Sequence, residues 1–155
     1  MSLYNDLGVE SDKAGIAKIF DGMNENLFLR CFCRIARDIW KKGWVMVKHA
    51  DGSGSKSMIH YLFYLSNNNI LAMSDDASDA LVMNSSDVAA AGFVDKLVFT
   101  NIVDISRLNV DKDLILRQVV EGLRRVKELY SKYGIEIIYT GGETADLPDQ
   151  VSVNP

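Results

Sequence analysis

The sequence predicts an α+β domain built on a four-stranded mixed or antiparallel sheet with helices packed on one face. Helix-like and strand-like segments follow one another in the order α-β-β-α-β-α-β, which is typical of this class. The 155 residues are 48% hydrophobic, which suffices for one core but not for most two-domain enzymes. We therefore expect residues 1–155 to form a single domain. A sheet covered on one side leaves an apolar face, so we also expect a homodimer formed through the sheets.

Three segments predict helices. Residues 11–41 show helical spacing of apolar side chains with one break, and residues 74–91 are rich in small side chains. Residues 111–133 carry the clearest apolar stripe. The expected N-caps are Ser74 for the second of these helices and Asn109 or Asp111 for the third.

Four segments predict strands. Residues 44–49 and 97–103 have strand propensity, and residues 58–65 are dense in aromatic and β-branched side chains. Residues 135–139 predict the last strand, which ends at a Gly-Gly pair. The polar segment between the first two strands would then be a loop between strands.

Composition narrows the function classes. The formal net charge is −4 and no basic run occurs, which argues against nucleic acid as the main partner. No apolar run reaches the roughly 18 residues that a membrane span needs, and residues 1–6 lack the features of a signal peptide. We expect a soluble cytoplasmic protein without a membrane partner.

The cysteines and histidines do not predict a zinc site. Cys31 and Cys33 fall in a predicted helix, where residues i and i+2 point about 200° apart, so we expect two small thiols that share neither a metal nor a disulfide. His49 and His60 have no partner at ligand spacing along the sequence.

Residues 51–56 read Asp-Gly-Ser-Gly-Ser-Lys and form the first of three polar clusters. Glycine N–H groups can approach a phosphate closely, lysine neutralises it, and aspartate can hold a magnesium ion. The segment is not a Walker A loop, because its lysine is expected to precede a strand. An ordinary hairpin loop is the alternative interpretation.

The second cluster lies within a predicted helix and the third follows a predicted strand. Asn84 and Asp87 share one helical face, with Asp79 on the same helix. A solvated face is the alternative, although the apolar run at residues 88–91 favours burial. Residues 140–146 read Thr-Gly-Gly-Glu-Thr-Ala-Asp, for which a loop with a surface carboxylate is the alternative.

Taken together and in this order, the three clusters resemble the N-terminal domain of phosphoribosylformylglycinamidine cyclo-ligase, or AIR synthase, over roughly residues 25–150. Its motifs are Asp-Gly-Val-Gly-Thr-Lys, Asp-x-x-x-Met-Asn-x-Asn-Asp and Gly-Gly-Glu-Thr-Ala-Glu/Asp. The resemblance implies an enzyme of purine biosynthesis that uses ATP and Mg²⁺ to convert formylglycinamidine ribonucleotide to aminoimidazole ribonucleotide. Its wider superfamily includes selenophosphate synthetase and thiamine-monophosphate kinase, and its domains usually pair through their sheets.

The resemblance also implies roles for individual residues. Asp51 and Asp87 would hold Mg²⁺ between the ATP phosphates, and Lys56 would contact phosphate. The remaining implied positions are Asp79 and Asn84 as ligands of the metal or partners of its ligands, the backbone of Gly52 and Gly54 along the phosphate, and Gly141, Gly142, Glu143 and Thr144 beside nucleotide, metal or substrate. No residue is assigned as general base.

Three departures from the family pattern keep alternatives open. Ser86 replaces the asparagine before Asp87, and the glycine- and phenylalanine-rich N-terminal motif has no clear match in residues 11–40. Family members also continue into a second domain, whereas this chain ends at Pro155. We therefore expect the family's first domain, as a fragment, a split gene product or an expressed domain, and a separate C-terminal half is one partner that this allows. The alternatives are a non-catalytic dimeric nucleotide-binding or regulatory module and another ATP-dependent phosphotransferase of the superfamily.

Overall fold

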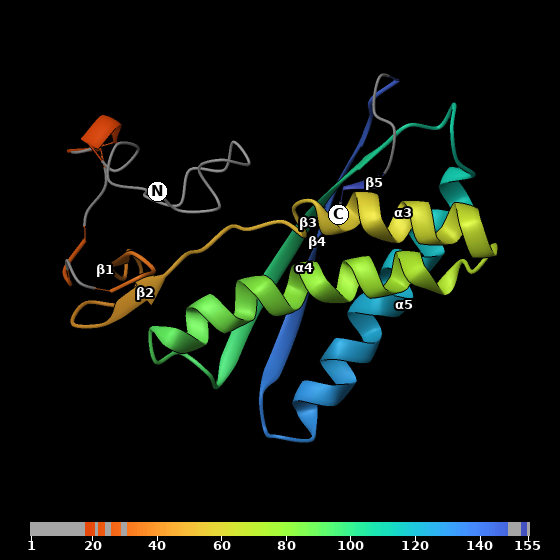
Figure 1. Cartoon of the computed structure of the whole chain (residues 1–155). Helices are drawn as coiled ribbons and strands as arrows, with labels where there is room; N and C mark the ends of the chain where they lie inside the picture. Colours follow the sequence, from red (N-terminus) through yellow and green to blue (C-terminus); the bar gives the residue numbers. More distant parts are fainter. Residues whose placement is uncertain (1–17, 21, 24–25, 29–30, 149–152, 155) are drawn as a thin grey trace, which may run out of the picture.

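The computed structural model describes residues 18–20, 22–23, 26–28, 31–148 and 153–154 (Figure 1). The described helices and strands are β1 (Ile35–Arg37), β2 (Val45–Val47), α3 (Lys56–Asn67), α4 (Leu71–Ala90), β3 (Lys96–Ile105), α5 (Lys112–Ser131), β4 (Glu136–Asp146) and β5 (Val153–Asn154). None of the helices in this part of the chain is long and apolar enough to cross a membrane.

The described strands form two sheets instead of the expected four-stranded one. β1 and β2 make an antiparallel hairpin, and β4, β3 and β5 make a separate sheet in that order. β3 and β4 run parallel and β5 is antiparallel to β3, so the larger sheet is mixed, as expected. α5 connects the two parallel strands, because such a connection must cross back over the sheet. The α+β class is confirmed, and the strand count is corrected.

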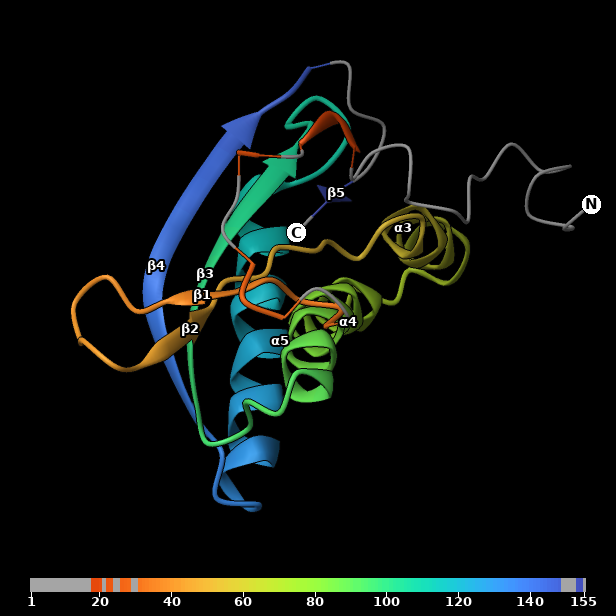
Figure 2. The same cartoon turned by 90° about the vertical axis from the view of Figure 1, so that its left-hand side faces the viewer.

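The helices cover one face of the larger sheet, as predicted. Figure 2 shows α5 against β3 and β4, with α4 and then α3 further from the sheet. Two apolar clusters hold these layers together: Met73, Ala77, Val103, Ile105, Ile115 and Val119 in one, and Leu81, Val126 and Ile137 in the other. On β3, Val98 and Ile102 remain 69% and 64% exposed, so part of the uncovered face is apolar.

The strand predicted at residues 58–65 is wrong, since this segment belongs to helix α3. Ser57 and Tyr61 are buried and Tyr64 packs against the core, which is helical spacing. Ile59 and Leu62 remain more than half exposed. A short apolar run cannot be assigned to strand or helix from hydrophobicity alone.

The helix predicted through residue 39 is also wrong, because Ile35–Arg37 forms β1. Buried Cys33 and Ile35 alternate with exposed Phe32 and Arg34, which is the two-residue period of an extended chain. Much of the predicted segment before residue 31 lies outside the described residues.

The predicted helix ends are partly confirmed. Asp111 caps α5 by accepting a hydrogen bond from the backbone N–H of Leu114 at 3.1 Å, which decides between the two candidates. Ser74 is not a cap, because α4 begins at Leu71 and the Ser74 hydroxyl donates to the carbonyl of that residue. Gly92, with φ +89°, follows the end of α4 as expected.

Candidate functional site

The loop between β2 and α3 is fastened to the middle of α4. The side-chain oxygen of Asn84 accepts a hydrogen bond from the backbone N–H of Asp51 at 2.8 Å, and its amide nitrogen donates to the Asp51 carbonyl at 2.7 Å. The same nitrogen also donates to the Ala80 carbonyl. Asn84 therefore fixes the backbone of the loop, and in this arrangement its amide serves the fold.

This clamp brings together three side chains that can bind a metal ion. One ligand atom each from His49, Asp51 and Asp87 lies within 4.8 Å of the others. Nε2 of His49 and Oδ2 of Asp87 are 2.9 Å apart. Carboxylate oxygens are ordinary ligands of Mg²⁺, so Asp51 and Asp87 fit the metal that the sequence predicts, and His49 adds an imidazole nitrogen, which is an ordinary ligand of other divalent cations.

His49 was missed as a candidate because its partners were sought at fixed spacing along the sequence. The partner comes from α4 instead, where Asp87 is only 28% exposed. One signal was present: His49 and Asp51 are two apart in an extended segment, which places their side chains on the same side of the chain.

Cys33 supports the backbone of this site. Its thiol donates to the carbonyl of Asp87 at 3.1 Å, so the N-terminal segment is tied to the same turn of α4. Burial, followed by the negative charge of Asp87, raises the pKa of the Cys33 thiol. The thiol therefore stays protonated near neutral pH and acts as a hydrogen-bond donor.

Asp79 lies in a second polar group, formed with α3. Its Oδ2 is 3.2 Å from Nζ of Lys56 and 3.5 Å from Nε2 of His60. The expected metal ligand Asp79 is thus paired with a lysine, and among the described residues it lies outside the group formed by His49, Asp51 and Asp87.

Residues 51–55 lead directly into the N-terminus of α3. Gly54 adopts φ +61°, a left-handed conformation that glycine accepts without strain, and Lys56 is the first residue of the helix. No acidic residue lies in the first turn and no side chain caps it. The loop therefore opens a helix instead of joining two strands, and the dipole of that helix favours an anion at its N-terminus.

A buried carboxylate lies beneath this loop. Asp76 of α4 is fully buried, and its Oδ1 accepts a hydrogen bond from the Ser57 hydroxyl at 3.3 Å. That hydroxyl is 2.5 Å from the hydroxyl of Ser53, while Oδ2 of Asp76 has no hydrogen-bond partner. Burial raises the pKa of Asp76. Asp76 belongs to none of the three polar clusters of the sequence, and it lies inside α4 instead of in the first turn that a cap at Ser74 would give it.

The third cluster lies inside β4, which extends through residue 146 instead of ending at residue 139. Gly142 lies opposite Asn101 next to a break in the β3–β4 register, and Gly141 accepts a hydrogen bond from the Thr100 hydroxyl. Glu143 is exposed and accepts a hydrogen bond from the backbone N–H of Thr144.

The third cluster is not joined to the first two. Among the described residues, no hydrogen bond or ion pair links residues 141–144 to Asp51, Asn84 or Asp87. The apolar run at residues 88–91 also differs from expectation, because Ala89 and Ala90 are exposed.

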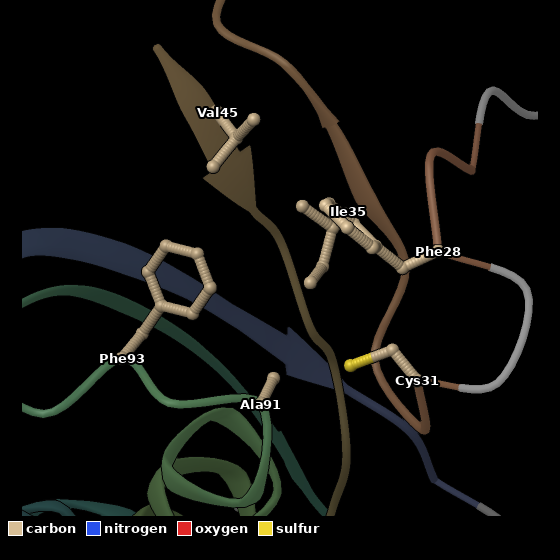
Figure 3. A pocket seen from close by; sticks show the side chains of 6 residues that line it. All are labelled: Phe28, Cys31, Ile35, Val45, Ala91 and Phe93. Atoms are coloured by element: carbon tan, nitrogen blue, oxygen red, sulfur yellow. The ribbon is translucent and has the colours of Figure 1, made fainter.

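An apolar pocket of about 440 Å³ lies between the β1–β2 hairpin and the end of α4 (Figure 3). Its lining consists of Phe28, Cys31, Ile35, Val45, Ala91 and Phe93. None of these side chains carries a formal charge and none offers a side-chain oxygen, so the lining does not suit phosphate or a hard cation such as Mg²⁺. The polar chemistry is concentrated in the loop at residues 51–56 and on α4.

Comparison with known proteins assigns the family. The family described as AIR synthase related protein, N-terminal domain, matches residues 32–155. The chain belongs to this family. A comparison with curated proteins found no match to this chain. The match covers β1 to β5 and all three polar clusters. It assigns the AIR synthase related superfamily, which is a broader group than the cyclo-ligase itself.

Proposed function

We propose that this domain is the ATP-binding part of a phosphoribosylformylglycinamidine cyclo-ligase. The observation that carries the proposal is the meeting of Asp51 and Asp87, with Asp51 in the loop that leads into the N-terminus of α3. Carboxylates that hold a cation, on a loop that leads to a helix end that favours anions, suit a magnesium-bound polyphosphate. The order of the three sequence motifs supports the cyclo-ligase over other superfamily members.

Residues of the loop and of α4 would bind different parts of the magnesium–nucleotide complex. Asp51 and Asp87 would hold Mg²⁺, which offsets phosphate charge during phosphoryl transfer when it is bound. Lys56 would contact phosphate from the first turn of α3, after exchanging part of its ion pair with Asp79. The backbone of Gly52 and Gly54 would line the phosphates, and Asn84 would keep the loop in place.

The substrate would be formylglycinamidine ribonucleotide. ATP would activate its amide oxygen, and an internal nitrogen would then close the imidazole ring, giving aminoimidazole ribonucleotide, ADP and phosphate. Glu143 and Thr144, with Gly141 and Gly142, would face nucleotide or substrate from β4. A second domain of the kind that the resemblance implies would complete this part of the site, and no residue among residues 1–155 is assigned as general base.

We also propose a homodimer formed through the uncovered face of the larger sheet. Val98 and Ile102 of β3 are 69% and 64% exposed, and Ile138 of β4 lies opposite Val98 in the sheet. Apolar side chains gathered on a sheet face that no helix covers favour a second copy of the same face. Analytical ultracentrifugation tests this, and a monomer at micromolar concentration would contradict it.

Calorimetric titration of the chain with Mg-ATP tests the nucleotide site. Asp87→Asn should weaken binding by about 1 to 3 kcal/mol, because a charged ligand contact is lost. The control is Asp95→Asn, an exposed carboxylate in the loop before β3, which should leave binding unchanged. Equal effects of the two substitutions, or no Mg-ATP binding with a C-terminal half present, would refute the proposal.

Ser86 favours a second candidate function, a non-catalytic nucleotide-binding module. Its hydroxyl donates to the Met83 carbonyl within α4 at 3.0 Å, so it does not replace the amide that the family has at this position. Steady-state assays of the chain mixed with a separately expressed C-terminal half separate the two functions. Turnover of formylglycinamidine ribonucleotide would exclude the non-catalytic module.

A further inference from the structure

We propose that His49 is a third ligand of the metal site, so that this site selects a first-row divalent transition metal, such as Mn²⁺ or Co²⁺, over Mg²⁺. The inference rests on the proposed function for the two carboxylates, Asp51 and Asp87, but concerns the identity of the metal. His49 lies outside the three polar clusters that carry the resemblance.

The distance between the two closest ligand atoms suits a shared ion. Metal–nitrogen and metal–oxygen bonds are about 2.0 to 2.2 Å long, so two ligands at right angles on one ion lie about 3 Å apart. Nε2 of His49 and Oδ2 of Asp87 are 2.9 Å apart. Asp51 is exposed and its carboxylate lies within 4.8 Å of both, so a side-chain rotation would complete the set.

The direction of the imidazole distinguishes this arrangement from an ordinary histidine–aspartate hydrogen bond. Nε2 of His49 is buried and has no hydrogen-bond partner, although Asp87 is in contact with it. An N–H bond and a nitrogen lone pair occupy the same direction in the ring plane. The lone pair of Nε2 is therefore not directed at the Asp87 oxygen. This is the arrangement expected when the nitrogen and the oxygen both point toward one metal ion.

The surroundings hold the ring without occupying its nitrogen. The side chain of His49 is 18% exposed, and the ring of Phe32 is tilted against it with centroids 6.2 Å apart. The other histidine contrasts with this one, because His60 shares its carboxylate, Asp79, with the ammonium group of Lys56. The ammonium group of Lys56 already supplies a positive charge at the second group, whereas among the described residues the ligand atoms of the His49 group lie close enough together to share a metal ion.

One imidazole and two carboxylates are a ligand set with a metal preference. Mg²⁺ favours oxygen ligands and retains much of its water, whereas imidazole suits first-row transition metals. Three protein ligands leave positions open for phosphate oxygens or water. A transition metal at this site would thus serve the same nucleotide while binding more tightly than Mg²⁺.

Titration of the metal-free chain with Mn²⁺ and with Mg²⁺, followed by calorimetry without nucleotide, tests the inference. We expect Mn²⁺ to bind at least about tenfold more tightly than Mg²⁺, and His49→Gln to remove this preference, since even a lost supporting contact costs about 10- to 100-fold in metal affinity. His60→Gln is the matched control, as it removes the other of the two histidines, and it should retain the preference.

Pulsed electron paramagnetic resonance of the Mn²⁺-loaded wild-type chain gives a readout that needs no variant. Coupling to an imidazole nitrogen should be present in wild type and in His60→Gln, and absent in His49→Gln. Equal Mn²⁺ and Mg²⁺ affinities, or a spectrum without nitrogen coupling, would overturn the inference. Mg-ATP binding that is lost in Asp87→Asn but unaffected in His49→Gln would reject this inference and retain the proposed function.

Discussion

The contact between α4 and α5 depends on the absence of a side chain at Gly122. A Cβ atom built there would lie 2.1 Å from the backbone oxygen of Ser74 and 3.1 Å from Cβ of Ala77. Both neighbours belong to α4, so no flexible side chain can move aside. Gly122→Ala should therefore push the two helices apart by about 1 Å to restore an ordinary contact, which costs about 1 to 3 kcal/mol as overpacking.

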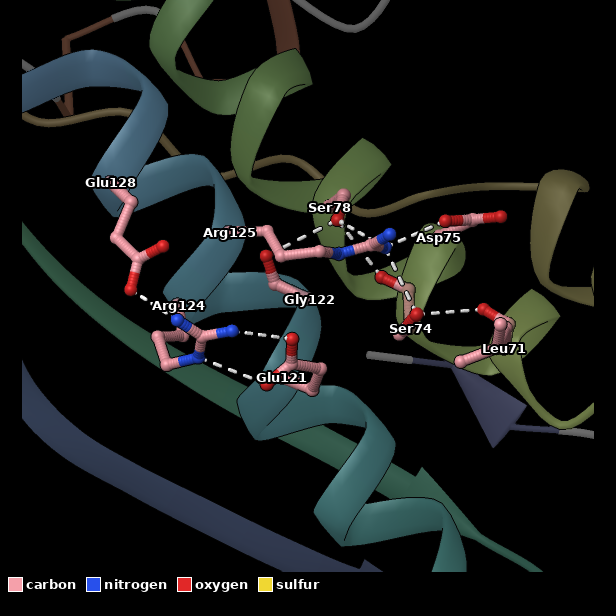
Figure 4. A network of polar contacts seen from close by, with 9 residues as sticks. All are labelled: Leu71, Ser74, Asp75, Ser78, Glu121, Gly122, Arg124, Arg125 and Glu128. Carbon is pink, nitrogen blue, oxygen red and sulfur yellow. Dashed lines mark hydrogen bonds and ion pairs between the residues drawn. The ribbon is translucent and has the colours of Figure 1, made fainter. Parts of the chain in front are cut away.

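The same shift would stretch the polar contacts shown in Figure 4. Nη2 of Arg125 donates to the Ser74 hydroxyl at 2.9 Å and to Asp75 at 2.6 Å, and the Ser78 hydroxyl donates to the Gly122 carbonyl at 3.2 Å. Weakening them adds about 1 kcal/mol. The helix propensity of alanine returns about 1 kcal/mol.

The expected net destabilisation of Gly122→Ala is about 1 to 3 kcal/mol, or roughly 2 to 12 °C in melting temperature for a chain of this size. Urea unfolding followed by circular dichroism measures it. Val120→Ala is the matched control, because Val120 is on the same helix and 64% exposed, and it should change stability by less than about 0.5 kcal/mol. A Gly122→Ala protein as stable as wild type would refute the argument.

Three further substitutions test other parts of the structure. Burial raises the pKa of Asp76 in the folded chain, so above the ordinary carboxyl pKa of about 4 the folded protein binds more protons than the unfolded protein, and the free energy of unfolding falls as pH rises. Asp76→Asn should remove this fall in urea titrations at several pH values. An unchanged pH profile would contradict the argument. Gly142→Ala would place a Cβ 2.0 Å from the Asn101 carbonyl oxygen and should destabilise the β3–β4 pair by about 1 to 3 kcal/mol in thermal melts. Asp111→Ala should cost about 1 kcal/mol by removing the cap of α5, whereas no loss would show that the cap is dispensable.

The elements that sequence analysis predicted well are those whose pattern is long. In α5, Ile115, Val119 and Val126 are buried on one face, and twenty residues of helical periodicity leave little room for another interpretation. β3 was placed correctly for a similar reason, and it was extended by pairing with β4 along nearly its whole length. In α5 and β3, the tertiary contacts favour the same secondary structure as the local sequence pattern.

The elements that were mispredicted are short, and their surroundings decide them. Aromatic side chains raise the strand propensity between Met58 and Leu65. The loop at residues 51–55, which contains the left-handed Gly54, nevertheless leads directly into a helix. That helix can then bury Tyr61 against α4. Strand propensity measures how a side chain fits a half-buried sheet surface, and no sheet is available at this place.

The candidate site was only half predictable, because a metal site is defined in space. The motif at residues 51–56 and the carboxylate of Asp87 were found from residue type and order. His49 was not found, since its contact with Asp87 depends on how the hairpin and the loop cross α4. Asp79, conversely, shares a helix with Asp87 and yet pairs with Lys56, so a common helix is not sufficient for a common site.

The same geometry explains why the loop is held before any ligand arrives. Asn84 binds both backbone groups of Asp51, and the thiol of Cys33 binds the carbonyl of Asp87, so neutral groups fix the backbones that carry the two carboxylates. The carboxylates retain oxygen lone pairs for a cation, although Oδ1 of Asp51 also accepts a hydrogen bond from the backbone N–H of Gly52 at 2.8 Å. Like charges held close together repel one another, and a divalent cation relieves that repulsion. Without a cation, the clamp therefore holds two negative charges close together at a cost in free energy. A bound metal ion removes this cost, so the clamp favours metal binding.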